Sequence, residues 1–109
     1  MAYAEELADR IRRVLKRRRG VSEKKMFGGI SFLVSGNMAC GVVGKEICVR
    51  VGPAAYETAL SHPQVREMDF TGKPLRGMLY VSAKGIGSDA DLKSWVEQGV
   101  THARSLPAK

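Results

Sequence analysis

Two tight-turn signals inside one stretch of alternating residues constrain this chain more than any other feature. Between residues 29 and 51, apolar side chains alternate with small or polar ones, as they do along half-buried strands. Ser35-Gly36-Asn37 and Gly44-Lys45 interrupt this alternation with residues typical of hairpin loops. The sequence therefore predicts three consecutive antiparallel strands over residues 30–34, 38–43 and 46–51.

The two loops also predict the register of these strands. A two-residue loop at Gly44-Lys45 places Val42 opposite Ile47, and a three-residue loop at 35–37 places Val34 opposite Met38. A single register then gathers the apolar residues on one face of the sheet, which is how a register becomes specified. The residues expected on this core face are Ile30, Phe32, Val34, Met38, Cys40, Val42, Ile47, Val49 and Val51.

This register separates the two cysteines. Cys40 points to the core, opposite Val49, whereas Cys48 lies opposite Gly41 on the other face. A disulfide cannot join opposite faces of one sheet, so we expect two buried, reduced thiols. The spacing of these cysteines, with only two histidines elsewhere, fits no zinc pattern, and no metal site is expected.

Three amphipathic or capped segments predict helices. The first ends at Gly20 and carries a stripe at helical spacing, formed by Tyr3, Leu7, Ile11, Val14, Leu15 and Arg18. The second, Pro53–Leu60, begins with a proline and turns Tyr56, Ala59 and Leu60 inward. The third starts after the capping residue Ser88, with Asp91 as its partner, and carries the stripe Leu92, Trp95, Val96, Gly99 and Ala103.

Residues 65–70 and 77–82 predict two further strands, joined by the turn Thr71-Gly72-Lys73-Pro74. The expected order is α-β-β-β-α-β-β-α, an α+β fold in which helices pack on an antiparallel meander sheet. A length of 109 residues fits a single domain, residues 1–109. The longest apolar run is far shorter than the ~20 residues of a membrane span, and the acidic N-terminus does not resemble a signal peptide, so we expect a cytoplasmic protein with no membrane partner.

No residue pattern predicts a catalytic centre. His62 precedes a proline, His102 lies in the last helix, and no nucleophile motif surrounds a serine. Gly85-x-Gly87 precedes a helix and could hold an anion, but it lacks the lysine and third glycine of phosphate loops. We therefore interpret residues 85–87 as a loop leading into the helix, and expect neither enzyme activity nor a cofactor.

The positive charge is concentrated near the N-terminus. The net charge is +7, and residues 10–25 hold nine cations against the single acid Glu23. Two interpretations remain open: a solvated surface that raises solubility, or a surface that contacts nucleic-acid phosphates or an acidic partner with weak specificity. The candidate contact residues are Arg10, Arg13, Lys16, Arg17, Arg18, Arg19, Lys24 and Lys25.

Several of these motifs together resemble a known family. Residues 24–34, KKMFGGISFLV, are followed by Gly36-Asn37-Met38, and residues 70–81, FTGKPLRGMLYV, precede the Leu92 and Trp95 helix. In this order and over roughly residues 5–106, the chain resembles the N-terminal domain of the TfoX/Sxy family. We expect a stand-alone domain, without the second, C-terminal domain of full-length relatives.

The resemblance implies a secretion-chaperone-like α+β fold and a regulatory role. Full-length relatives regulate natural competence together with a cyclic-AMP receptor protein. For this chain it suggests a non-catalytic regulatory or protein-interaction module, with a transcription factor, the polymerase or a second copy (a homodimer) as partner, and direct nucleic-acid binding as the alternative. We expect the family motif residues to shape the fold: Met26, Phe27, Gly28, Gly29, Gly72, Lys73 and Pro74.

Overall fold

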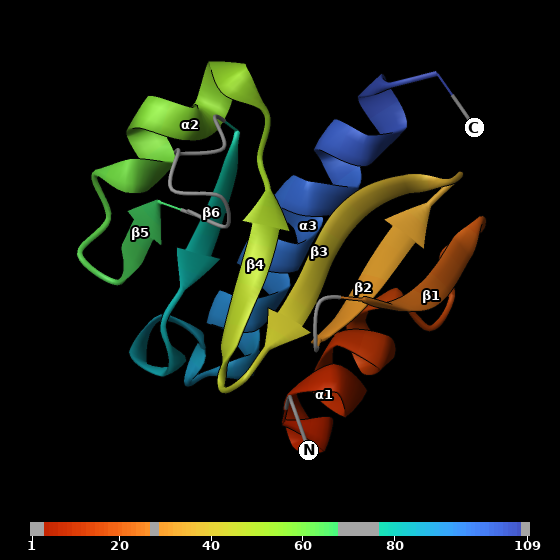
Figure 1. Cartoon of the computed structure of the whole chain (residues 1–109), viewed down its shortest axis with the longest axis horizontal. Coiled ribbons are helices and arrows are strands. Elements are labelled where there is room, and N and C mark those ends of the chain that lie inside the picture. Colours follow the sequence, from red (N-terminus) through yellow and green to blue (C-terminus); the bar gives the residue numbers. More distant parts are fainter. Residues whose placement is uncertain (1–3, 27–28, 68–76, 108–109) are drawn as a thin grey trace.

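The structure is a computed structural model that describes residues 4–26, 29–67 and 77–107. In these ranges the chain forms, in order, α1 (Glu5–Leu15), β1 (Val21–Met26), β2 (Gly29–Val34), β3 (Asn37–Val43), β4 (Glu46–Arg50), α2 (Pro53–Leu60), β5 (Val65–Glu67), β6 (Met78–Val81), a short 3₁₀ turn (Ala83–Ile86) and α3 (Asp89–Ser105). The α+β class expected from the sequence is confirmed (Figure 1).

All six strands join one antiparallel sheet in the order β1-β2-β3-β4-β6-β5. Strands β2, β3 and β4 form the expected meander, and β1 extends it at one edge, but β6 lies between β4 and β5, so the prediction of a meander throughout is wrong. The positions of β5 and β6 are reversed because α2 carries the chain past the free edge of β4 and leaves that edge for β6. There β6 pairs with both neighbours, with Leu79 opposite Val49 and Glu67.

The register predicted between β3 and β4 is confirmed, with Val42 opposite Ile47 and Gly41 opposite Cys48. Between β2 and β3, Phe32 lies opposite Cys40 as expected, but an irregularity follows at Phe32/Leu33. The loop therefore has two residues, both with positive φ, and Met38 pairs with Leu33 on the face opposite the core. The prediction that Met38 belongs to the core is wrong because a one-residue slip reverses the face of a side chain.

The N-terminal segment differs from the prediction in two ways. Helix α1 ends at Leu15, not near Gly20, so Lys16–Arg19 lie in the loop that follows it. Gly20 has a φ of +75°, and its carbonyl accepts the Ser35 N–H at 2.9 Å, which draws this loop to the β2–β3 turn. The chain then forms β1, an edge strand that the sequence did not predict.

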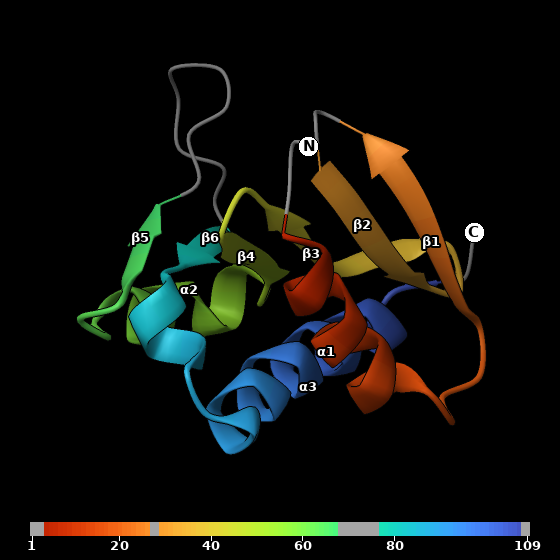
Figure 2. The ribbon, with the colours of Figure 1, turned by 90° about the horizontal axis from the view of Figure 1, so that it is seen from below.

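The helices pack against one side of the sheet (Figures 1 and 2). Helix α3 lies across β3 and β4, and α1 lies beside it, so that their apolar faces meet the expected core residues. The two layers approach closely at Gly99, where an added Cβ would lie 2.2 Å from the Ala39 carbonyl oxygen. We call the other side, which none of the described helices covers, the open face of the sheet.

The strand predicted over 77–82 is present as β6, and the one predicted over 65–70 is described at Val65–Glu67 as β5, while the predicted turn at 71–74 lies outside the described residues. Helix α2 has the expected bounds and starts with Pro53. Ser88 caps α3 by accepting the Asp91 N–H at 3.1 Å, and the predicted stripe of α3 is buried. Residues 85–87 were expected to be a loop, but Gly85 belongs to the 3₁₀ turn that precedes the cap.

Candidate binding surfaces

Residues 10–25, which hold nine cations, are called the basic segment, and three of its arginines are engaged in contacts within the molecule. The Arg10 guanidinium donates to the Ile86 carbonyl at 2.8 Å and reaches Asp89 at 3.3 Å, so it joins α1 to the start of α3. Arg18 pairs with Glu97 in the middle of α3. Arg12 is bound by Glu23 and by Asp9 at 2.7–2.9 Å. These side chains hold α1 in place and are only partly exposed.

The ion pair between Arg12 of α1 and Glu23 of β1 shifts the pKa values of both side chains. Arg12 hydrogen-bonds the Glu23 carboxylate, which lowers the pKa of Glu23, although partial burial opposes the change. The same hydrogen bond, followed by the one that Arg12 donates to Asp9, raises the pKa of Arg12. Glu23 is the single acid of the basic segment, and its position explains how the edge strand β1 is fixed to the helix.

The remaining predicted contact residues are exposed: Arg13, Lys16, Arg17, Arg19, Lys24 and Lys25. The structure divides them, because Lys24 and Lys25 lie on β1 while Arg17 and Arg19 lie in the loop after α1. It also adds Arg104, from the last turn of α3, to Arg17 and Arg19 around one open hollow of about 620 Å³. Arg18, Gly20 and Ser35 complete its lining, and we call it the arginine hollow.

One glycine of the family motif has a clear structural requirement. A Cβ on Gly29 would lie 2.3 Å from the Val42 carbonyl oxygen, so only glycine fits where β2 begins beside β3. Met26 is the last residue of β1. Phe27, Gly28, Gly72, Lys73 and Pro74 lie outside the described residues.

Sequence reasoning missed the open face of the sheet as a surface. Its central row crosses all six strands, since each residue is the register partner of the next: Lys24, Ser31, Gly41, Cys48, Tyr80 and Arg66. The four residues between its ends are buried, and all but Tyr80 are small, whereas the two ends are cationic. An added Cβ at Gly41 would lie 2.7 Å from the Ile30 carbonyl oxygen and 3.1 Å from the Cys48 sulfur, so the floor of the face is tightly packed.

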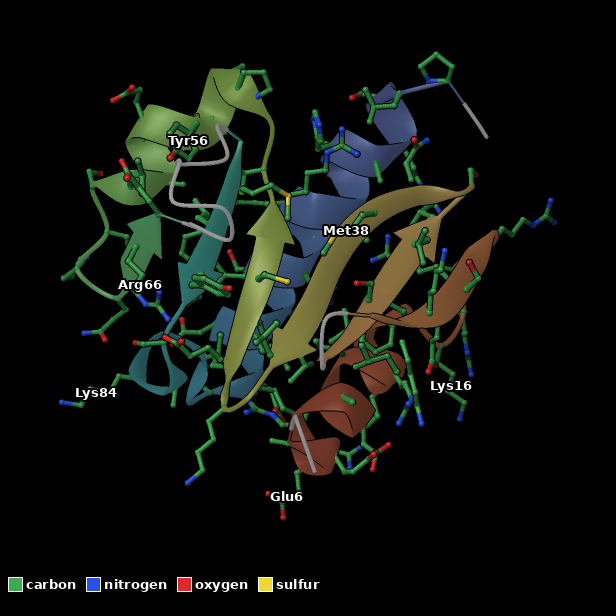
Figure 3. All side chains as sticks on the ribbon, in the orientation of Figure 1. Glu6, Lys16, Met38, Tyr56, Arg66 and Lys84 are labelled. Carbon is green, nitrogen blue, oxygen red and sulfur yellow. The ribbon has the colours of Figure 1, made fainter. Side chains whose placement is uncertain are left out.

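Partly exposed apolar side chains flank this row. Met38, Val43 and Met78 pack around Cys48 and Tyr80, separately from the main core. Leu33 pairs with Met38 on the same face. Figure 3 shows Met38 and Arg66 on this side of the sheet. The face therefore combines an apolar centre with charged ends. In the sequence it is indicated by the residues that lie between the core-facing ones along β2–β4.

Contacts on the open face also order its polar groups. The Arg66 guanidinium lies 4.3 Å from the centre of the Tyr80 ring and pairs with Glu46. Burial raises the pKa of Tyr80, with a smaller electrostatic contribution from Cys48, and burial raises the pKa of Cys48 to about 12. Both groups are thus neutral at physiological pH, and Cys48 is an apolar part of the floor.

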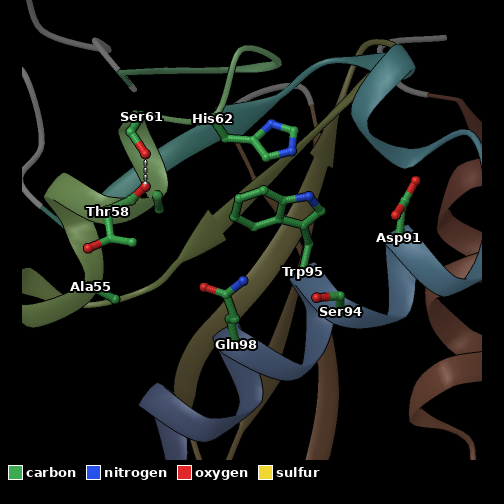
Figure 4. Close-up of a pocket in the computed structure, with 9 residues that line it drawn as sticks. Ala55, Thr58, Ser61, His62, Asp91, Ser94, Trp95 and Gln98 are labelled. Atoms are coloured by element: carbon green, nitrogen blue, oxygen red, sulfur yellow. Dashed lines mark hydrogen bonds between the residues drawn. The ribbon is translucent and has the colours of Figure 1, made fainter.

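A second hollow, of about 340 Å³, lies between α2 and α3 and contains both a histidine and a serine (Figure 4). His62 meets Trp95 edge to face, with the ring centres 5.6 Å apart, and its Nδ1 accepts the Gln64 N–H. The Ser61 hydroxyl donates to the Thr58 carbonyl at 2.6 Å. Ser61 and His62 are therefore each engaged in a local contact, and Asp91 lies apart from His62 (Figure 4).

His102 is likewise used in packing. Its ring fills the space beside Gly52, where an added Cβ would lie 2.4 Å from Nδ1. Partial burial, and then the charge of Arg50, lower the pKa of His102. Within the described ranges, no three His, Cys, Asp or Glu side chains gather as ligands for a metal ion.

The family model of the TfoX N-terminal domain matches residues 13–103, most of the chain. The chain belongs to the TfoX N-terminal domain family. The match spans both the loop after α1, Lys16–Arg19, and the open face of the sheet. A search of curated proteins and one of solved structures found no significant match. Among residues 4–26, 29–67 and 77–107, no helix of this TfoX N-terminal domain has the length and apolar character needed to cross a membrane.

Proposed function

We propose that this TfoX N-terminal domain is a non-catalytic regulatory module that binds a partner protein through the open face of its sheet. The observation that carries the proposal is the apolar centre of that face, formed by Met38, Val43 and Met78 around Tyr80 and left uncovered by the described helices. Large contiguous apolar patches on a protein surface are characteristic of interaction sites. Methionine, tyrosine and arginine are also the residues enriched at protein interfaces.

The charges on the open face favour a particular partner. Lys24 and Arg66 end the central row, and Arg50 lies opposite Met78 on the same face. The described carboxylate among them, Glu46, is already paired with Arg66. The face therefore suits a partner segment that carries apolar and acidic side chains. Two copies meeting face to face would bring these cations together, which disfavours self-association at this surface.

The partner we propose is a component of the transcription machinery, either a transcription factor or the polymerase. The test is affinity capture from the source cells with the wild-type chain, with Met38→Glu on the open face, and with Ala54→Glu on the exposed surface of α2 as a charge-matched control. We expect wild type and Ala54→Glu to retain a transcription factor or polymerase subunit, and Met38→Glu to lose it.

Two results would contradict this proposal. One is the absence of any transcription component from the wild-type capture, together with unchanged promoter activity when the gene is deleted. The other is a concentration-dependent dimer that Met38→Glu dissociates and Ala54→Glu does not, because that result would assign the open face to a second copy of the chain.

A further inference from the structure

We propose that the arginine hollow is a binding site for the phosphodiester backbone of nucleic acid. This inference does not depend on the proposed function, because the hollow lies at the end of the sheet and shares no lining residue with the open face. Its cations come from two distant parts of the sequence, the loop after α1 and the last turn of α3. Figure 2 shows the start of β1, the β2–β3 turn and the end of α3 on the same side of the molecule.

The walls of the hollow are held by specific hydrogen bonds. The Ser35 N–H bonds the Gly20 carbonyl at 2.9 Å, which joins the loop after α1 to the β2–β3 turn. The buried Asn37 amide donates to the Pro107 carbonyl at 2.9 Å and lies 3.5 Å from the Ala103 carbonyl, which joins the same turn to the end of α3. The arginines are thus brought together by the fold, on backbone that is tied in place.

The charge of the hollow is not neutralised from within. None of its lining residues carries a carboxylate. Arg18 is paired with Glu97 outside the lining, but Arg17, Arg19 and Arg104 have no ion pair with any of the described residues. One cation in the last turn of α3 would suffice to stabilise the helix dipole. Several unpaired guanidinium groups around one hollow repel one another, and a bound anion relieves that repulsion.

The form of the site indicates a phosphate polymer. Guanidinium groups bind phosphate oxygens through two parallel hydrogen bonds, and the exposed Ser35 hydroxyl adds a further donor. The hollow is open and about 620 Å³ in volume, which leaves room for a segment of a polymer that continues beyond it. Since no aromatic ring lines it, the hollow offers contacts to the backbone and no surface for stacking bases.

Binding of a labelled DNA duplex of about 20 base pairs, followed by fluorescence anisotropy from about 50 mM salt upward, tests the site. The site variant is Arg17→Gln with Arg104→Gln, one substitution from each side of the hollow. The matched control is Lys45→Gln with Lys84→Gln, which removes two exposed cations elsewhere. Unfolding curves verify that both double variants retain the wild-type fold.

We expect the wild type to bind with an affinity that falls steeply with salt. The site variant should bind about tenfold more weakly at low salt, with a log–log salt slope shallower by about 1.8, because two phosphate contacts are lost. The control should stay within about twofold of wild type, since a change in net charge alone has a small effect on an exposed surface.

Three outcomes would overturn the proposal. The first is no binding by the wild type at low salt. The second is an equal loss in both double variants, which would show a diffuse charge effect without a site. The third is binding of polyglutamate of matched charge as tightly as the duplex, with the same loss in the site variant, which would assign the hollow to an acidic protein segment.

Discussion

The two faces of the sheet are formed by the same strands but differ in the size and burial of their side chains and in what covers them. On the helix side, large branched and aromatic residues such as Phe32 and Ile47 are fully buried beneath α1 and α3. On the open face, the residues between them in sequence are small, like Gly41, or sulfur-containing, like Met38 and Cys48. Alternation along the strands therefore encodes two different surfaces in one segment.

This difference separates the residues that stabilise the fold from those available for recognition. One side of an antiparallel sheet suffices to form a core, and the other side can face solvent. The open face retains apolar side chains although the described helices leave it uncovered, so stability alone does not account for its composition. Four predictions test how far the two faces differ, from the largest expected effect to the smallest.

Phe32→Ala should cost about 3–5 kcal/mol of the free energy of unfolding, because it leaves a cavity in the centre of the core. Leu33→Ala, at the next position and on the open face, should cost less than half as much. Guanidinium unfolding of both variants measures the difference. Equal losses would mean that the open face is as tightly packed as the core.

Gly41→Ala should destabilise the chain by about 1–3 kcal/mol, since the new Cβ would lie 2.7 Å from the Ile30 carbonyl oxygen, a backbone atom with little freedom to move. Gly87→Ala is the control: its Cβ would lie 3.9 Å from the nearest atom at a φ of −64°, and should change stability by less than about 0.5 kcal/mol. Similar thermal unfolding midpoints for the two variants would contradict the close packing inferred for the open face around Gly41.

The third prediction concerns Glu23, which lies at the edge of the helix side of the sheet and forms an ion pair with Arg12. Its pKa is lowered by Arg12, so the pair stabilises the fold above the usual glutamate pKa of about 4.3 and loses that effect as the pH falls through the lowered value. Both side chains are over one third exposed, which limits the effect to about 0.5 kcal/mol.

Glu23→Gln should therefore be less stable than wild type at neutral pH and equally stable well below the lowered pKa of Glu23, in urea unfolding at the two pH values. A difference that persists unchanged in acid would show that the glutamate acts through packing and not through its charge.

Met38→Gln should have the smallest effect, at most about 0.5 kcal/mol, because Met38 is partly exposed on the open face. Unfolding at two protein concentrations measures it. A loss that approaches that of Phe32→Ala and grows with protein concentration would show that a second copy covers this face in solution.

The sequence was most informative where local signals agreed. Alternation and turn residues together determined the pairing of β3 with β4, and with it the separation of Cys40 from Cys48. The serine cap of α3 was likewise visible, because the cap and its partner are three residues apart. In both cases the interactions that decide the structure lie within a few residues of one another.

The features that the sequence did not predict depend on contacts between distant residues. Val21–Met26 is mostly polar and has no alternating pattern, and it forms a strand because the edge of β2 is free to pair. Lys16–Arg19 suit a helix by composition, but the contact of Gly20 with the β2–β3 turn draws the chain away from α1. Arg104 joins the arginine hollow only because α3 crosses the sheet.

The position of α3 also determines when the chain can complete its fold. Arg10 and Arg18 of the first segment contact Ile86, Asp89 and Glu97, and the core face of β3 is closed only when α3 covers it. During synthesis, β1 to β4 leave the ribosome before this helix does, with one apolar face exposed. Folding must therefore end with contacts between distant residues, and the nascent sheet is most vulnerable to aggregation just before α3 emerges.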